Sequence, residues 1–214
     1  MNWQNILYSL PGIILGLTLH EYCHAFAAYK LGDHTARDMG RLTFNPVKHI
    51  DPVGFLFIIF AGFGWARPVL FNPANLRNLR RDKALIAAAG PLSNLALALV
   101  LIAMIKAWQA LPDLTSNTAV LSFFFSGAFI PIITGIFRAA TINLGLFIFN
   151  LFPIPPLDGS HIVFSSLNLK AETETKIMKI GGPLLFLIII IQNTTGVTIL
   201  PIGKLISAIF DLLL

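Results

Sequence analysis

Long apolar runs joined by short polar links restrict this fold more than any other feature of the sequence. Residues 84–105, "ALIAAAGPLSNLALALVLIAMI", contain no charged side chain, and such a run reaches the ~20 residues that a helix needs to cross a bilayer. Only 12% of the residues are charged, whereas a soluble domain carries about 25%. The sequence therefore predicts an all-α polytopic membrane protein with about five to six transmembrane helices.

The breaks between the apolar runs set the limits of these helices. We expect spanning segments over residues 3–29, 82–108, 119–152 and 181–214. Gly90 and Pro91 predict a break or kink in the second segment. The third segment is too long for one straight span, and Pro131, Gly135 and Arg138 are the residues that can bend or divide it. The last segment is expected to form two short spans around a turn.

A shorter apolar segment, residues 52–70, does not fit a spanning helix. Its apolar core has only about ten residues before the glycines at 62 and 64, too few to cross a bilayer. The segment is rich in Phe and Ile and is broken by glycine, so we expect a short membrane re-entrant loop of β character. Because an unpaired strand edge is unstable in lipid, this loop should be sheltered by protein or line a cavity.

Positive charge is concentrated in one link between the apolar runs. Nine of the fifteen Lys and Arg residues lie between Lys30 and Lys83, interleaved with acidic and apolar residues. This distribution is typical of a cytoplasmic membrane flank and not of a nucleic-acid-binding patch. The N-terminus is therefore expected outside, and the lipid bilayer, not nucleic acid, is the expected partner.

The first apolar segment ends in "HEYCH", which contains three ionisable side chains. His20 and His24 are four residues apart, so both imidazoles face one point from the same side of a helix. Two neutral imidazoles suit Zn²⁺, and Glu21 between them can take a proton from a water molecule that the metal acidifies. Unpaired ionisable groups inside a membrane cost ~2.5–3.5 kcal/mol or more each, which favours a metal site over a chance motif. A hydrogen-bonded packing cluster is the alternative.

Two histidines leave a catalytic zinc site incomplete, because such sites normally use three protein ligands. The candidates for the third are His34, His49, Asp158 and His161. His34 and His49 lie in the polar link, where an ordinary surface histidine is the favoured interpretation. Asp158 lies in "PIPPLDG" between apolar segments, where it either coordinates the metal or caps a short helix, and the spacing leaves both open. His161 either lies close behind the metal ligands or is an interfacial histidine, and we favour the second.

"HEYCH" in the first apolar helix followed by "NLFPIPPLDG" resembles the site-2 proteases, intramembrane zinc metalloproteases that cut transmembrane helices. The resemblance covers about Gly12 to Ile162. It implies that His20 and His24 are zinc ligands, that Glu21 is the general base and that Asp158 is the third ligand. One Zn²⁺ per chain is the implied cofactor, and transmembrane proteins are the implied substrates.

Three further stretches carry the same resemblance. Asn94 ends "GPLSN" and Asn150 begins the Asn-x-x-Pro-x-Pro-x-x-Asp-Gly pattern, so either amide is a candidate to stabilise the oxyanion of a tetrahedral intermediate. An interhelical hydrogen bond is the alternative for each. "AGFGWARPV" resembles the family's re-entrant β-loop, whose edge would pair with an unwound substrate strand. The residues expected to contact the substrate there are Gly62, Phe63, Gly64 and Trp65.

The sequence thus predicts one integral-membrane metalloprotease domain over residues 1–214, without the PDZ or CBS domains of many relatives. We expect it in a prokaryotic inner membrane with its active site toward the cytoplasm. The chain has Asp158-Gly159-Ser160-His161 where the family often has Asp-Gly-Gly-Arg, so no role of that Arg can be transferred. A metal transporter and a zinc-binding scaffold are the alternatives. The absence of an internal repeat disfavours the first, and the intact Glu21 disfavours the second.

Overall fold

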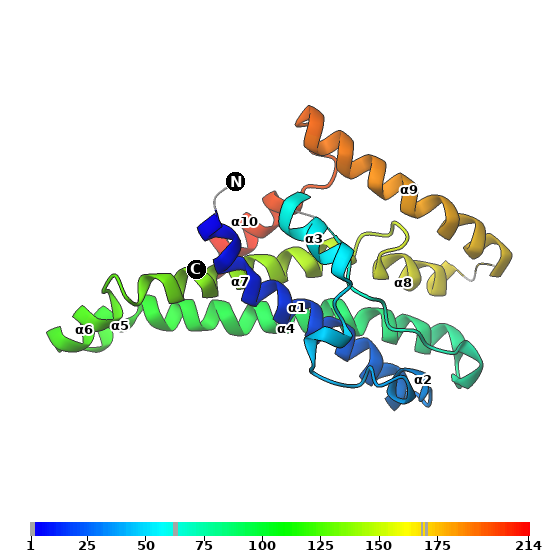
Figure 1. The fold of residues 1–214 in the computed structure, drawn as a ribbon, viewed down its shortest axis with the longest axis horizontal. Coiled ribbons are helices and arrows are strands. Elements are labelled where there is room, and N and C mark those ends of the chain that lie inside the picture. Colours follow the sequence, from blue (N-terminus) through cyan, green and yellow to red (C-terminus); the bar gives the residue numbers. More distant parts are fainter. Residues whose placement is uncertain (1–2, 62–63, 168, 170) are drawn as a thin grey trace.

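The computed structural model describes residues 3–61, 64–167, 169 and 171–214, and within them it is helical with no β-strand. The helices are α1 (Trp3–Lys30), α2 (Thr35–Asp38), α3 (Pro52–Ala61), α4 (Leu79–Gln109), α5 (Leu111–Leu114), α6 (Thr118–Phe124), α7 (Ile130–Asn150), α8 (Asp158–Leu167), α9 (Ala171–Thr195) and α10 (Ile202–Leu213), with 3₁₀ turns η1 (Pro46–Lys48) and η2 (Pro73–Asn75). Figure 1 shows α1, α4 and α7 running side by side, with α8 and α9 grouped at one end.

Helices α1, α4 and α7 form the centre of the molecule. Small residues allow their backbones to approach closely, as is common between membrane helices. A Cβ added at Gly12 of α1 would lie 2.6 Å from the Cα of Ala139 on α7. The buried apolar core of α4 and α7 consists of Ala98, Ile102, Ile105, Ile133, Ala140 and Leu144. This rigid three-helix unit carries most of the residues discussed below.

Four helices in the described part of the chain are long and apolar enough to cross a membrane: α1, α4, α7 and α9. This set of helices does not confirm the predicted count of about five to six spans, which stays a prediction. At the C-terminal end, two short spans were expected from residue 181 onward, and the charged stretch before that residue is not a separate link. Instead it begins α9, in which Glu172 and Glu174 occupy the first turn, and acidic residues stabilise a helix there. With only 12 residues, α10 is too short to span.

The other helix limits agree more closely with expectation. Helix α1 begins at the predicted residue, and the third apolar region is divided as predicted, since α6 ends at Phe124 and α7 begins just before Pro131. Helix α4 starts at Leu79, three residues early, because Asn78 caps it by accepting a hydrogen bond from the Arg81 N–H. Of the break or kink predicted near Pro91, the break is not seen, since α4 continues through Pro91.

The segment expected to form a β-loop is helical in its first half. Asp51 accepts a hydrogen bond from the Gly54 N–H (2.8 Å) and caps α3, and Pro52 occupies the first helical position, where proline is favoured. After α3, residues 65–71 contain no helix or strand, and a single antiparallel bridge joins Ala66 to Ile50. Gly62 and Phe63 lie outside the described residues. These local capping signals, which overrode the Phe and Ile content, explain why the strand expectation for residues 52–61 is wrong.

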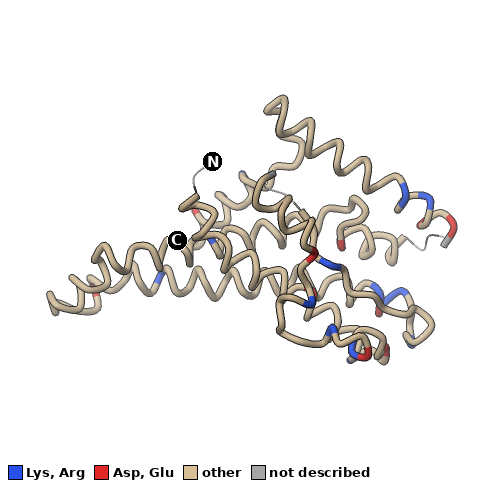
Figure 2. Tube along the Cα trace, viewed as in Figure 1, with Lys and Arg blue, Asp and Glu red and all other residues tan. Residues whose placement is uncertain are grey.

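Charge is distributed unevenly over the molecule. Figure 2 shows most Lys and Arg residues at the end formed by the links between α1 and α4 and by the start of α9, with few at the end formed by α5 and α6. At the charged end, Lys83 of α4 pairs with Glu174 of α9 at 2.5 Å. The "HEYCH" motif lies toward this end, because it is in the second half of α1 and the charged link follows directly after α1.

Candidate metal centre

The two histidines of α1 and Asp158 of α8 meet in the interior. The His20 and His24 Nε2 atoms are 3.0 Å apart, and Asp158 Oδ2 lies 3.2 Å from the first and 3.4 Å from the second. His20 is 7% exposed and His24 is 9% exposed. Asp158 is the first residue of α8, at the end of the Pro-rich link. The site therefore combines a local helix spacing with a side chain from far along the chain.

Hydrogen bonds fix the orientation of both imidazoles. His20 Nδ1 is 2.7 Å from Asn94 Oδ1, and His24 Nδ1 is 2.7 Å from the carbonyl oxygen of Ile86. Both partners are acceptors, so each Nδ1 carries the ring proton and each Nε2 presents a lone pair. The 3.0 Å approach of the two Nε2 atoms is consequently not a hydrogen bond but a meeting of two acceptors.

A metal cation fits this donor set. Asp158 Oδ2 is buried and has no hydrogen-bond partner within the described residues, so three lone-pair-bearing atoms face one point and repel one another. Ligands held tetrahedrally at the ~2.0–2.1 Å typical of Zn²⁺ are about 3.3 Å apart, close to the three separations found here. Two imidazoles and one carboxylate are also a ligand set that catalytic zinc sites use. The group formed by His20, His24 and Asp158 can therefore hold a metal ion.

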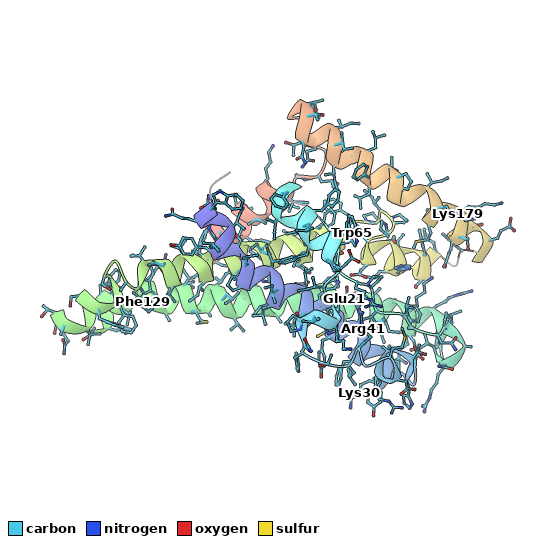
Figure 3. All side chains as sticks on the ribbon, in the orientation of Figure 1. Glu21, Lys30, Arg41, Trp65, Phe129 and Lys179 are labelled. Carbon is cyan, nitrogen blue, oxygen red and sulfur yellow. The ribbon has the colours of Figure 1, made fainter. Side chains whose placement is uncertain are left out.

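Glu21 lies beside this group on the next position of α1 and is 7% exposed. Its Oε2 accepts a hydrogen bond from the Val69 N–H at 3.0 Å, so the segment after α3 crosses next to the carboxylate. The guanidinium of Arg41, itself buried, donates to the carbonyl oxygen of Arg67 in the same segment. Figure 3 shows the labelled Glu21 close to Arg41 and Trp65, and far from Phe129 at the opposite end of the molecule.

A cavity of about 510 Å³ opens in front of the metal-ligating atoms. Asn150 of α7 and His161 of α8 lie on its wall, and so do Gly64 and Trp65, two of the four residues expected to contact a substrate. Burial lowers the pKa of His161, and the nearby Lys83 adds to this effect. Residues Ala66, Pro68, Val69 and Phe71 complete that side of the cavity.

The structure places three other predicted residues away from the cavity. Asn94 is fully buried behind His20, and its amide group donates to the carbonyl oxygen of Gly16 (3.0 Å) and to Asn143 Oδ1 (2.9 Å). His34 is exposed, as expected of a surface histidine. His49 is not, because it is fully buried with its Nε2 2.7 Å from the Thr43 carbonyl oxygen. The surface interpretation of His49 is therefore wrong.

Sequence reasoning missed one residue of this network. Asn143 is fully buried on α7, and its amide group donates to the Ala139 carbonyl oxygen at 2.8 Å while its Oδ1 accepts from Asn94. A chain of hydrogen bonds therefore runs from His20 through Asn94 and Asn143 to the backbone of α7. The available signal was a polar amide in an apolar span, which needs an internal partner.

A buried site of two histidines, an aspartate and an adjacent glutamate in a set of membrane-spanning helices defines a membrane-embedded metallohydrolase. The model of peptidase family M50 matches residues 8–190. The chain belongs to this family, and it is an intramembrane zinc metalloprotease of the site-2 type. The transporter and scaffold alternatives are not favoured.

Similar proteins carry consistent names. "Putative zinc metalloprotease YwhC" of Bacillus subtilis (strain 168) is 37% identical over 97% of this chain and 94% of its own length. "Putative zinc metalloprotease Rip2" of Mycolicibacterium smegmatis is 28% identical over 85% of this chain and 66% of its own. The protein of the same name from Mycobacterium tuberculosis (strain ATCC 25618 / H37Rv) is 30% identical over 70% of this chain and 53% of its own. No solved structure matches the chain.

Proposed function

We propose that His20, His24 and Asp158 hold the zinc ion and that Glu21 is the general base of a protease that cuts transmembrane segments of membrane proteins. The observation that carries this proposal is the approach of three ligand atoms to within 3.4 Å of one another beside Glu21. The 510 Å³ cavity in front of them gives room for a peptide bond and a water molecule.

When bound, zinc supplies a Lewis acid that lowers the pKa of a coordinated water and polarises a carbonyl. Glu21 takes the proton of the attacking water and passes it to the leaving amine. The Val69 N–H holds one Glu21 oxygen, which fixes the orientation of the carboxylate. Asn150, on the cavity wall, is the amide that we assign to the developing oxyanion.

We give Asn94 a different role from the oxyanion contact that its motif suggested. Its side chain is fully buried and already donates to Gly16 and Asn143, so it has no donor left for an oxyanion. We assign it to holding the His20 ring in the tautomer and orientation that present Nε2 to the metal. Asn143 supports Asn94 from behind.

The substrate backbone pairs with the extended segment from Ala66 to Phe71. Backbone groups alternate in direction along an extended chain, and the Arg67 N–H donates to the His49 carbonyl oxygen at 2.8 Å. Within the described residues, no hydrogen bond uses the Leu70 N–H or the Pro68 carbonyl oxygen. An unpaired edge beside a catalytic site suits β-strand addition by an unwound substrate. The same pairing extends to Gly64 and Trp65, which line the cavity.

The active site faces the cytoplasm of a prokaryotic cell, in its inner membrane. Support comes from the gathering of positive charge at the metal end of the molecule (Figure 2), since cytoplasmic flanks carry an excess of Lys and Arg. On this assignment α1 runs inward, α4 outward, α7 inward and α9 outward. Residues 1–214 act as one integral-membrane domain, and α3 with the extended segment is the re-entrant part.

The test uses detergent-purified protein, a zinc assay and a panel of single-span substrates. Glu21→Gln should keep zinc and lose turnover, whereas His20→Ala should lose zinc. His34→Ala is the matched control, because His34 is exposed and outside the cavity, and it should keep both. Equal cleavage by wild type and Glu21→Gln, or full zinc retention by His20→Ala, would contradict the proposal.

A further inference from the structure

Arg138 is the single charged residue of α7, and the proposed chemistry does not use it. It lies eight residues after the start of α7, which is ~12 Å along a helix that is long and apolar enough to span. Charged side chains inside spanning helices are rare and usually face a functional cavity or a partner of opposite charge. The proposed chemistry at the metal site therefore does not account for a charged residue at position 138.

Among the described residues, the guanidinium of Arg138 has one hydrogen-bond partner, Asn5 of α1, whose Oδ1 accepts from Nη2 at 2.5 Å. Its Nε is buried without a hydrogen-bond partner, and no ion pair among the described residues includes Arg138. Among the helices that pack against α7, α10 carries Asp211, and its neighbour Phe210 stacks on Phe137 with ring centroids 4.9 Å apart. Asp211 is exposed, and in the described part of the chain neither Asp211 nor Arg138 takes part in an ion pair.

Arg138 lines a cavity of about 620 Å³ to which α1, α3, α7, α9 and α10 contribute mostly apolar side chains, with Asn5, Gln192 and Asn193 among the polar ones. This cavity and the one at the metal centre share five lining residues: Leu17, Gly64, Leu146, Phe149 and Ile189. The two cavities are therefore neighbouring parts of one groove, with the metal ligands at one end and a cation at the other.

The length of the groove follows from α1. Asn5, which contacts Arg138, precedes His20 by fifteen residues, which is ~22 Å along a helix. The hydrocarbon core of a bilayer is ~30 Å thick. A transmembrane segment whose scissile bond lies at the metal centre must extend across most of the membrane, and an apolar groove of this length is able to receive it. A lipid headgroup, by contrast, is polar and does not account for the apolar part of the groove that joins the metal centre.

We propose that Arg138 is a specificity-determining residue that binds a carboxylate on the transmembrane substrate, about 15 helical residues from the cleaved bond on the outer side. The inference rests on the proposed function and names a class of substrate for it: single-span segments that are apolar along the groove and carry Asp or Glu at that distance. Binding of the carboxylate gives Arg138 the counter-ion that it lacks inside the protein.

The experiment compares substrates that are identical except for Asp or Asn at one position, scanned eight to eighteen residues from the cut. Their affinities are measured by fluorescence anisotropy on zinc-loaded Glu21→Gln protein, and their kcat/KM values on protein with Glu21 intact. With Arg138 present, one narrow range of positions should favour Asp over Asn about tenfold. Arg138→Gln should remove that ratio, and Arg138→Glu should favour Lys at the same position.

The control is Lys106→Gln, which removes an exposed positive charge near the end of α4 that does not line the cavity, and it should leave the ratio unchanged. An Asp-to-Asn ratio near one at all positions on protein with Arg138 intact would overturn the inference. So would a ratio that survives Arg138→Gln, as expected if Arg138 meets only lipid phosphate. If Asp211→Asn also abolished the preference for Asp over Asn in the substrate, Arg138 would be assigned to an interaction with Asp211 inside the protein, and the inference would be overturned. Because binding is measured on Glu21→Gln protein, a failure of the proposed catalysis is distinguishable from a failure of this inference.

Discussion

A single methyl group at position 90 should disable the metal centre. Gly90 of α4 faces the two histidines, and a Cβ built there would lie 2.6 Å from His24 Cε1 and 2.7 Å from His20 Cε1. Carbon atoms in contact are ~3.5–4.0 Å apart, so both rings would have to move by about 1 Å. The rings cannot rotate freely, because Asn94 and the Ile86 carbonyl oxygen hold their Nδ1 atoms.

The expected cost follows from the tolerance of metal sites. Ligand distances in such sites are satisfied within about ±0.2 Å, and disturbing the partners of a ligand typically lowers metal affinity 10–100-fold. A misplacement of 1 Å at a catalytic centre can cost about 100-fold in rate. We therefore expect Gly90→Ala to bind zinc at least tenfold more weakly and to cleave about 100-fold more slowly.

Zinc affinity by chelator competition and cleavage of a single-span substrate check this prediction. Gly203→Ala on α10 is the matched control, since nothing lies within 4 Å of its added Cβ and Gly203 does not line the cavity at the metal centre. Alanine also favours a helix over glycine by up to ~1 kcal/mol. If the steric reasoning is wrong, Gly90→Ala should be more stable than wild type and fully active, and that result would refute it.

Other predictions test the surroundings of the centre. Asn143→Leu should weaken zinc binding about tenfold, because Asn143 supports Asn94 and Asn94 orients His20. Asn143→Asp keeps the acceptor for Asn94 and should weaken zinc binding less. Chelator competition ranks wild type and the two variants, and equal zinc affinities would exclude a positioning role of Asn143. Removing zinc with a chelator should abolish cleavage and lower the melting temperature, and added zinc should restore both. The reason is that zinc at 100 times its Kd stabilises the folded state by about 2.7 kcal/mol. An unchanged melting temperature would mean that the folded state does not bind zinc. Burial raises the pKa of Asp33, but hydrogen bonds from Thr35, Asn75 and Asn72 outweigh it and hold that pKa below its usual range. The stabilising contribution of Asp33 should be full above about pH 4 and fall as the pH drops further. Asp33→Asn should therefore lower the melting temperature at pH 7 and reduce the decrease in melting temperature on acidification. The same melting temperature as wild type at every pH would exclude Asp33 as a stabilising group.

The sequence by itself determined the features that depend on local spacing. The 3.6-residue helical period puts His20 and His24 on one face, and unbroken apolar length identifies α1, α4 and α7 as spanning helices. The pairing of "HEYCH" with "PPLDG" also indicated the family correctly, because both motifs are short and specific.

Capping and long-range contacts limited what the sequence could predict. The Asp51 cap made α3 a helix in a segment whose Phe and Ile content suggested a strand. Acidic residues in the first turn stabilise α9, so this helix begins at Ala171 and includes the charged stretch before residue 181. His49 was expected on the surface because its neighbours in sequence are polar, but burial depends on neighbours in space.

Only the tertiary structure decided how the two halves of the site meet. Spacing left Asp158 open between a helix cap and a metal ligand, and the fold places its Oδ2 3.2 Å from His20 Nε2. The fold also buried Asn94 between His20 and Asn143, which removes it from the cavity. The physical reason is that helix period and apolar length are properties of neighbouring residues, whereas the direction of a buried polar side chain is set by the partner that packing brings to it.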